Sequence, residues 1–481
     1  MNVGLFSIAR SALITQQRVL DTVSQNIANA ETPGYSRQED IVTATNPIQM
    51  PWGMMGTGVS ATSIVRKRDL LLDDQFRNAS GDAGKSDLRR DALTNVQNIF
   101  GEPSDSGMSN ALDQFWNAWS DLASNPGGNS ERAVVQQRGD QIAHLFNNFS
   151  SGLSDQRNAN LNKLSTTVDE INGLANNVAK LNGQIKASEV SGSQAADLRD
   201  QRDTLIDQLA SKTGGRVIVQ NDGTSSVIVG NSTLVDGVTA RQLKLSLIPI
   251  TPPPATPSPD IPVRISLGDS PDALKPLGGQ LASMVDVLNN DIPQLRGRLD
   301  ALASQFVSTV NTAHSQGFVF TNNTIPGTPA GNFFDAGTLA APVTAVSIKL
   351  DAGVANDINK IAASKDPNAP LDNQMATQLA GLRTNNTTVS YTSTTGLETG
   401  SFLGFFRSTV TRLGLAVSNA TDDATVADTL VKQADNRRLS VSGVNTDEEL
   451  IKMVRVQQAY VAATKLIKTA DEMMQTILAM R

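Results

Sequence analysis

The chain has 481 residues, enough for about two to four domains by length alone. It carries 40 Lys and Arg against 47 Asp and Glu, and its formal net charge of −7 at pH 7 disfavours a nucleic-acid partner, whose phosphates require clustered basic side chains. The absence of cysteine excludes disulfides, thiol nucleophiles and thiolate metal ligands. Because aromatic residues make up only 4% of the chain, we expect thin helical cores without bulky aromatic packing.

The first predicted element is an amphipathic helix at the N-terminus. Apolar positions recur at alternating spacings of three and four, the period of one helix face, and Pro33-Gly34 then ends the helix. No basic segment precedes an apolar core here, so a cleavable signal peptide is not expected. The positions on this stripe are Phe6, Ala9, Leu13, Gln16, Leu20, Val23, Ile27 and Ala30.

The middle of the chain alternates between helical and strand-like patterns. Residues 38–65 suggest short strands and turns, and residues 69–212 are mostly helical, with breaks at 101–107 and 125–128. From 214 the pattern changes to β-strands, and after Gly278-Gly279 the helical period returns. No stretch approaches the roughly 18 apolar residues of a membrane helix, so no membrane insertion is expected.

The last predicted element is a second amphipathic helix, from Asp447 to Met480, without Gly or Pro. We expect Thr446 and Glu449 to form a capping box at its start. Polar groups on or beside the two stripes, Gln16, Asn26 and Gln457, are expected to set register. The positions on the C-terminal stripe are Met453, Val456, Tyr460, Ala463, Ile467, Ala470, Met474 and Ile477.

These patterns predict a mainly α fold with a small β insertion and discontinuous domains. Residues 1–45 and 440–481 are predicted to form a terminal coiled-coil axial domain, and residues 46–213 and 278–439 an elongated, mainly helical middle domain. Residues 214–277 are predicted to form a small β-rich inserted domain. Because a lone amphipathic helix is marginal in water, the terminal helices are expected to become ordered when neighbouring subunits bury their stripes.

A search for chemistry finds no catalytic, cofactor-binding or metal-binding constellation. The two histidines, His144 and His314, lie in separate helical tracts and are interpreted as satisfied or surface residues. Pairs such as Asp422-Asp423 are adjacent in sequence, so on a helix they point about a quarter-turn apart, whereas the carboxylates of glycosidases face each other across a cleft. The one dense basic run, Arg66-Lys67-Arg68, is followed at once by Asp69 and is interpreted as a solvated helix face.

Motifs at both ends resemble those of flagellar axial proteins. Residues 25–38, ending in Pro-Gly-Tyr-Ser-Arg-Gln, resemble the N-terminal signature of this family, and within it the hook-filament junction family, hook-associated protein 1. Residues 440–449, with the following Gln-Gln-Ala-Tyr and Thr-Ala-Asp motifs, are similar to the same family's C-terminal end. Internal matches include Glu170-Ile171-Asn172, Asp200-Gln201-Arg202-Asp203, Gly278-Gly279-Gln280-Leu281, Asn311, His314, Gly317 and Phe333-Phe334.

The resemblance implies a structural protein, not an enzyme, that needs no cofactor and assembles through its terminal helices. It implies self-association in a ring-like helical layer between the hook protein and the next junction protein or flagellin. It also implies type III export, with a chaperone on the C-terminal helix. The expected interface residues are Phe6, Leu13, Leu20, Val23, Asn26, Ile27, Pro33, Gly34, Tyr35, Met453, Val456, Gln457, Tyr460, Ile467, Met474 and Ile477.

Two alternatives stay open at this point. The nearer is another axial flagellar protein, from hook or distal rod, although the helical block at 150–212 disfavours it. The other is a flagellum-associated cell-wall hydrolase, which would require a cleft with a catalytic carboxylate.

Overall fold

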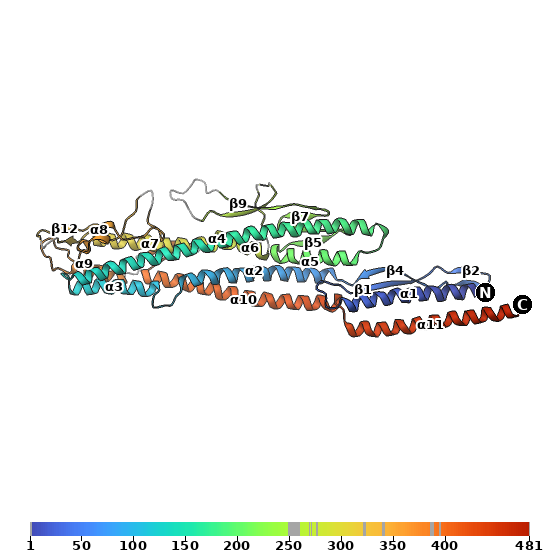
Figure 1. Ribbon diagram of the computed structural model, residues 1–481. Coiled ribbons are helices and arrows are strands. Elements are labelled where there is room, and N and C mark those ends of the chain that lie inside the picture. Colours follow the sequence, from blue (N-terminus) through green and yellow to red (C-terminus); the bar gives the residue numbers. More distant parts are fainter. Residues whose placement is uncertain are drawn as a thin grey trace.

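The protein is a long, narrow molecule built from helices that run along its length (Figure 1). The computed structural model describes residues 2–480, apart from 249–259, 269, 271, 276–277, 321–323, 339–341, 385–388 and 394–395. The two termini lie together at one end, so the chain runs out to the far end and back. The prediction of an elongated, mainly α fold is confirmed.

The end that holds the termini consists of two helices and two short strand pairs. Helix α1 (Asn2–Ala28) lies beside α11 (Thr446–Ala479) and runs in the opposite direction. Strand β1 (Gln38–Ala44) pairs antiparallel with β4 (Val59–Arg66), and β2 (Ile48–Met50) pairs with β3 (Gly53–Met55) in a hairpin between them. The short strands predicted between 38 and 65 are therefore present.

The body is a set of long helices whose breaks fall where the sequence indicated. Helix α2 begins after Asp69, whose carboxylate accepts hydrogen bonds from two backbone amides of the first turn, and it ends at Gly101 with a φ of 55°. Helix α10 packs along α2 over much of their length. The body helices are α2 (Leu70–Phe100), α3 (Met108–Ser124), α4 (Asn129–Ser188), η1 (Glu189–Ser191), α5 (Ala196–Thr213), α6 (Gly279–Asp286), η2 (Val287–Asp291), α7 (Ile292–His314), α8 (Ala352–Asn356), η3 (Ile358–Lys360), α9 (Gln374–Gly381), η4 (Leu382–Thr384) and α10 (Phe402–Ser442).

The predicted β region is a four-stranded antiparallel sheet, in the order β5-β6-β7-β8, followed by the antiparallel pair β9 and β10. Two smaller strand pairs lie later in the chain. The domain boundaries at 214 and 277 stay a prediction. The strands are β5 (Arg216–Val219), β6 (Ser225–Val229), β7 (Ser232–Asp236), β8 (Thr239–Ala240), β9 (Leu243–Leu247), β10 (Val263–Leu267), β11 (Phe318–Val319), β12 (Thr328–Pro329), β13 (Val389–Ser393) and β14 (Gly396–Gly400).

Two asparagines of α4 attach the sheet to the body. The Asn182 side chain accepts a hydrogen bond from Ser225 N and donates to Ser225 O and Gly237 O. In the same way Asn172 accepts from Leu243 N and donates to Leu243 O. Because each amide carries both a donor and an acceptor, it satisfies backbone groups at a strand edge without adding charge. Asn182 thus attaches the four-stranded sheet to α4, and Asn172 attaches the pair of β9 and β10.

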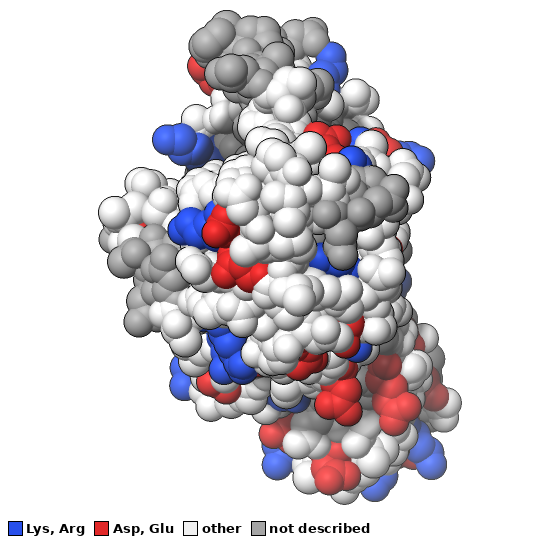
Figure 2. All heavy atoms as spheres, turned by 90° about the vertical axis from the view of Figure 1, so that its left-hand side faces the viewer, with Lys and Arg blue, Asp and Glu red and all other residues white. Residues whose placement is uncertain are grey.

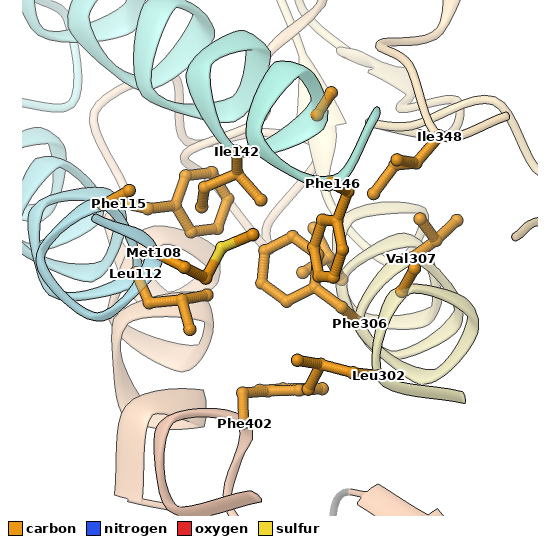
Figure 3. Packing of buried hydrophobic residues seen from close by; sticks show 14 of the residues in the cluster. Met108, Leu112, Phe115, Ile142, Phe146, Leu302, Phe306, Val307, Ile348 and Phe402 are labelled. Atoms are coloured by element: carbon orange, nitrogen blue, oxygen red, sulfur yellow. The ribbon is translucent and has the colours of Figure 1, made fainter. Parts of the chain in front are cut away.

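The core at the far end of the body is strongly aromatic, which corrects the expectation of thin cores. Side chains from α3, α4 and α7 converge there around Phe115, Phe146 and Phe306 (Figure 3). Phe306 contacts Trp116, Phe334 and Phe402 at ring-centroid distances of 5.2–5.7 Å. Composition alone failed here because the few aromatic residues are concentrated in one cluster instead of being spread along the rod.

His314 belongs to this core and is completely buried. Its Nδ1 lies 2.8 Å from Gly331 O and its Nε2 accepts a hydrogen bond from Ala362 N at 3.0 Å, an arrangement that the neutral imidazole satisfies with one proton on Nδ1. Burial lowers the pKa of His314 to about 4. The prediction of a satisfied core histidine agrees with this geometry.

The buried imidazole predicts an acid-sensitive body. An unfolded histidine takes up a proton near pH 6.5, whereas folded His314 stays neutral to about pH 4. Stability is therefore lost as pH falls from about 6.5 to about 4, by ~2–3 kcal/mol at pH 4.5. Chemical denaturation at pH 7 and pH 4.5 measures the loss. In His314→Gln the loss of unfolding free energy between pH 7 and pH 4.5 should shrink by ~2–3 kcal/mol. The control His144→Gln, at an exposed position, should show the same loss as the unaltered chain. Equal losses in all three proteins would refute the role of His314 in acid sensitivity.

Candidate assembly interface

Helices α1 and α11 are joined by a thin apolar seam. Val19, Val23 and Val456 are buried together, with Leu20, Ile27 and Met453 packed against them. Further along α11 the buried positions are Ala463 and Ala470, each seven residues after the last. Small side chains at these positions let the two helices approach closely, but they bury little apolar area. The pairing alone therefore contributes modest stability.

The remaining surface of α11 is also rich in large apolar side chains. Leu450, Val454 and Val461 follow one side of the helix, and Ile451, Leu466 and Met473 follow another; all six are exposed. A helix in water normally turns charged or polar groups toward the solvent on the faces that lack a partner. Helix α11 thus has one face covered by α1 and two faces with apolar side chains that this chain leaves uncovered.

The structure places the sequence-predicted interface residues in different surroundings. Val23, Asn26 and Val456 are buried; Phe6, Leu13, Leu20, Ile27, Tyr35, Met453 and Ile467 are half-buried; Pro33, Gly34, Gln457, Tyr460 and Met474 are exposed. Ile477 lies within α11, but its side chain is outside what the structure describes. Several of these side chains are used inside the chain, and their role between subunits stays a prediction.

The turn after α1 lies against the body. Gly34 has a φ of 82°, a region that favours glycine, and a Cβ at this position would collide with Thr204 of α5. Pro33 and Gly34 therefore let the chain turn tightly over α5. The next four residues, Tyr35, Ser36, Arg37 and Gln38, are called here the anchor segment.

Asn26 connects α1 to the anchor segment and to α11. Its amide nitrogen donates to Gln38 O at 3.0 Å and to Glu449 Oε2 at 3.2 Å, and its oxygen accepts from Gln38 N and from the Tyr35 hydroxyl. Burial, followed by the charges of nearby Asp and Glu side chains, raises the pKa of Tyr35, so its hydroxyl keeps the proton that it donates. Every hydrogen-bonding group of the buried Asn26 side chain is thus satisfied within one chain.

Glu449 is completely buried and is held by charge. Arg37 Nε donates to Glu449 Oε1 at 2.7 Å, and its Nη1 donates to the exposed Glu448 at 3.1 Å. The expected capping box is therefore wrong. Asn445, not Thr446, caps α11 by accepting from the Asp447 and Glu448 amides. The Glu449 carboxylate, which a capping box would turn back to the helix start, is engaged with Arg37 and Asn26.

The other half of the anchor segment binds α5. Ser36 donates from its amide and its hydroxyl to Asp200, at 3.0 and 2.6 Å, and the Gln38 side chain donates to Asp197 at 3.1 Å. The backbone of Arg37 donates to the carbonyl of Ser442, the last residue of α10. Four residues in sequence therefore connect α1, α5, α10 and α11.

The basic run after β4 is not a solvated helix face, as the sequence had suggested. Arg66 and Arg68 are largely buried, and Arg66 Nη1 donates to Asp200 at 2.6 Å and to Asp203 at 2.9 Å. Arg68 pairs with Asp73 at 2.6 Å and Asp203 at 3.2 Å. A buried guanidinium requires such partners, and the helix begins only at Leu70, beyond the run.

These partners form a row on α5 that sequence reasoning missed. Asp197, Asp200, Asp203 and Asp207, here called the carboxylate ladder, recur at spacings of three, three and four residues and so share one helix face. Burial opposes ionisation of Asp203, but Arg66, Arg202 and Arg68 outweigh it and lower its pKa to about 2. The spacing was a visible signal; the arginines that pair with it come from distant parts of the chain.

The C-terminal residue of the carboxylate ladder, Asp207, binds arginines of α2 and α10. Asp207 accepts from Arg77 at 2.7 Å and from Arg438 at 2.6 Å, and the Arg438 guanidinium lies 3.7 Å from the centroid of the Phe76 ring. Three of the four ladder carboxylates, those of Asp200, Asp203 and Asp207, are thus paired with arginines. Among the residues that the structure describes, no three or more His, Asp or Glu side chains are arranged to hold a metal ion.

The surface at the end opposite the termini carries charges of both signs. Figure 2 looks onto the end opposite the termini and shows Lys and Arg interspersed with Asp and Glu over a mostly uncharged surface. No continuous basic patch that would suit a phosphate backbone is visible on this face. None of the described helices is both long and apolar enough to span a membrane.

Comparisons with known proteins identify the family. A family model described as the helical domain of flagellar hook-associated protein FlgK matches residues 93–334. A model of the flagella basal body rod protein matches residues 6–35, which contain most of α1. A model of the C-terminal part of the basal body rod FlgEFG proteins matches residues 436–480, which contain all of α11. The flagellar hook-associated protein 1 of Bacillus subtilis is 30% identical over 98% of this chain and 96% of its own length. The chain belongs to the flagellar hook-associated protein 1 family.

More distant relatives agree. The hook-associated protein 1 of Escherichia coli is 25% identical over 99% of this chain and all of its own length. The flagellar hook junction protein of Burkholderia pseudomallei shares the fold, with a TM-score of 0.63 over 77% of this chain and all of that chain, at 15% identity. The resemblance in the terminal motifs is confirmed, and this member of the hook-associated protein 1 family is a structural protein of the bacterial flagellum.

The anchor segment predicts how the terminal helices can be detached from the body. Arg37→Ala leaves the buried Glu449 carboxylate without its cationic partner, at a cost of ~3 kcal/mol. Hydrogen exchange should then accelerate in α1 and in the first turns of α11, while α2 and α4 keep their protection.

Two further variants make this prediction specific. Adding Glu449→Gln to Arg37→Ala should restore part of the protection, because a neutral amide needs no cation. The matched control is Arg455→Ala, which removes an exposed arginine from α11, the helix that contains Glu449. Its hydrogen exchange should equal that of the unaltered chain. If Arg37→Ala exchanges no faster than this control, the pairing does not hold the helices.

Proposed function

We propose that copies of this chain form the layer between hook and filament, and that the layer assembles through α1 and α11. The observation that carries the proposal is the uncovered apolar surface on two sides of α11. Exposed apolar surface of this extent marks a site for other chains. The membership of the family and the separate matches of both terminal segments to rod-protein models support the same region.

The proposed interface keeps the residues expected from the sequence but gives them different tasks. Asn26, Tyr35 and Val456 fix the pair to the body and to each other, so they act by positioning. Tyr460, Met474 and the two uncovered sides of α11 are proposed to contact neighbouring copies. Pro33 and Gly34 are exposed beside α5 and are available to a neighbour as well.

The proposed partners follow from a place in an axial structure. One end of the layer contacts the hook protein, and the other contacts the next junction protein or flagellin. Before assembly the same apolar sides of α11 favour aggregation, so we propose that an export chaperone covers this helix and that the chain leaves by the flagellar type III route.

We propose that the chain has no enzymatic activity. The family assignment supports a role as a junction protein over a role as hook or rod protein, because the matched helical domain is that of the hook-associated protein. The alternative, a cell-wall hydrolase, predicts release of soluble fragments from purified peptidoglycan. We expect none above the buffer control; turnover abolished by a single carboxylate substitution would overturn this part of the proposal.

The proposed function predicts the effect of removing the last helix. A chain without residues 447–481 should keep its helical body, because both main cores lie outside this segment. Cells that produce only this chain should carry hooks without filaments, as seen by electron microscopy. Normal filaments would refute the role of α11.

A point substitution tests the same surface in the full-length chain. Val461→Asp places a charge on an exposed apolar side of α11 and should abolish filament attachment without changing the unfolding of the body. The matched control is Thr464→Asp, at an exposed polar position one turn later, which should retain filaments. Equal loss in both variants would mean that α11 tolerates no added charge anywhere, and would argue against a specific apolar contact.

A further inference from the structure

Residues 41–65 contain no Asp, Glu, Lys, Arg or His, although the chain as a whole is 18% charged. This segment, here called the uncharged arm, holds most of β1, the β2–β3 hairpin and nearly all of β4. Surface segments of this length normally carry charges that keep them soluble. Their absence indicates that this arm is not designed to face water on every side.

The hairpin at the end of the arm exposes large apolar side chains. Ile48, Trp52 and Met54, here called the hairpin tip, are 53%, 69% and 64% exposed. A two-stranded hairpin is marginal by itself, and this one is supported where Met55 packs over Gly4 of α1. The hairpin therefore lies against the first turns of α1 with its apolar tip uncovered.

Helix α1 separates the hairpin from α11 of the same chain. Its Thr15 hydroxyl and Arg18 guanidinium donate to the backbone of β4, whereas Leu20 and Val23 pack toward α11. At 3.6 residues per turn these two sets lie on roughly opposite sides of α1. Figure 1 shows the same order, with β2 and β4 on one side of α1 and α11 on the other. The hairpin tip is thus kept from the outer sides of its own α11.

We infer that the hairpin tip of one copy packs against the uncovered apolar side chains near the C-terminal end of α11, around Met473, in a second copy. The inference rests on the proposed function and names the contact by which neighbours join. The hairpin lies level with the first turns of α1, which lie beside the last turns of α11 (Figure 1). A neighbour at the same level presents Met473, which is 51% exposed, and Met480 on the same side.

The chemistry favours a second copy as the occupant. An uncharged tip desolvates no ion when it packs, and the contact joins an indole ring with methionine sulfurs, a favourable pairing. The hairpin tip lies on the side of α1 away from α11, whereas Met473 lies on a flank of α11, three residues after the buried Ala470. The two surfaces do not form one patch, so the contact is head-to-tail. Such a contact repeats from copy to copy and generates a closed ring or a helical layer, whereas a self-complementary contact would stop at a dimer.

A disulfide test uses the fact that the chain has no cysteine of its own. Full-length chain with Met54→Cys and Met473→Cys replaces the unaltered chain in cells, and isolated flagella are oxidised and separated on a non-reducing gel. A ladder of multiples of the chain mass is expected. The matched control pairs Met54→Cys with Val190→Cys, an exposed position in the body, and should give monomer only.

Other outcomes overturn the inference. In the first group of outcomes, cells with the double-cysteine chain carry filaments while the chain stays monomeric, stops at dimers or links to a different protein. Each of these results rules out the proposed contact and leaves the junction role intact. If instead the unaltered chain itself supports no filaments in these cells, the proposed function fails first.

A substitution covers the case in which the double-cysteine chain fails to assemble. Trp52→Ser removes the largest apolar side chain of the tip at an exposed position, so the body should unfold as before, while filaments per cell should fall at least tenfold. Val238→Ser, which removes an exposed apolar side chain from the turn between β7 and β8, should leave the number unchanged. A normal filament number with Trp52→Ser would overturn the inference.

Discussion

The buried pair of Arg37 and Glu449 is the interaction on which the arrangement of this molecule depends. The two residues are more than four hundred positions apart, and their 2.7 Å contact fixes the first turns of the last helix to the segment that follows the first helix. Asn26 completes the arrangement with a second hydrogen bond to the same carboxylate. Because an unpaired buried charge is costly, the chain is held in this geometry or loses the docking of both ends together.

The contact also divides the terminal helices into two parts. Near the body, polar and charged groups are satisfied inside the chain, around Asn26, Tyr35 and Glu449. Toward the free end, the buried positions of α11 are the alanines Ala463 and Ala470, and large apolar side chains of α11 remain uncovered. The first part sets the direction in which the helix pair leaves the body. The second part supplies the surface that neighbouring chains are proposed to cover.

Much of the fold was visible in the sequence because its signals are local. Periodicity located the helices, and Gly101 and Gly214 marked the ends of α2 and α5. The first helix ends earlier than predicted, at Ala28, and Pro33-Gly34 forms the turn that follows. What could not be predicted depends on distant partners. The sequence predicted a solvated helix face at Arg66 and Arg68, whereas both bind carboxylates of the distant helix α5. It predicted a capping box at Glu449, whereas this carboxylate binds Arg37. The aromatic core was missed because composition reports an average over the whole chain.

Helix α11 is fixed to the body at its start, and other chains are proposed to cover the rest of it. Hydrogen exchange of the free, full-length protein tests this most directly, since it resolves protection along one helix. We expect slow exchange in α2, α4 and the first turns of α11 around Glu449, and exchange that becomes progressively faster from Ala463 to the end of α11. Protection of the whole of α11 at the level of α2 and α4 in the free protein would contradict it.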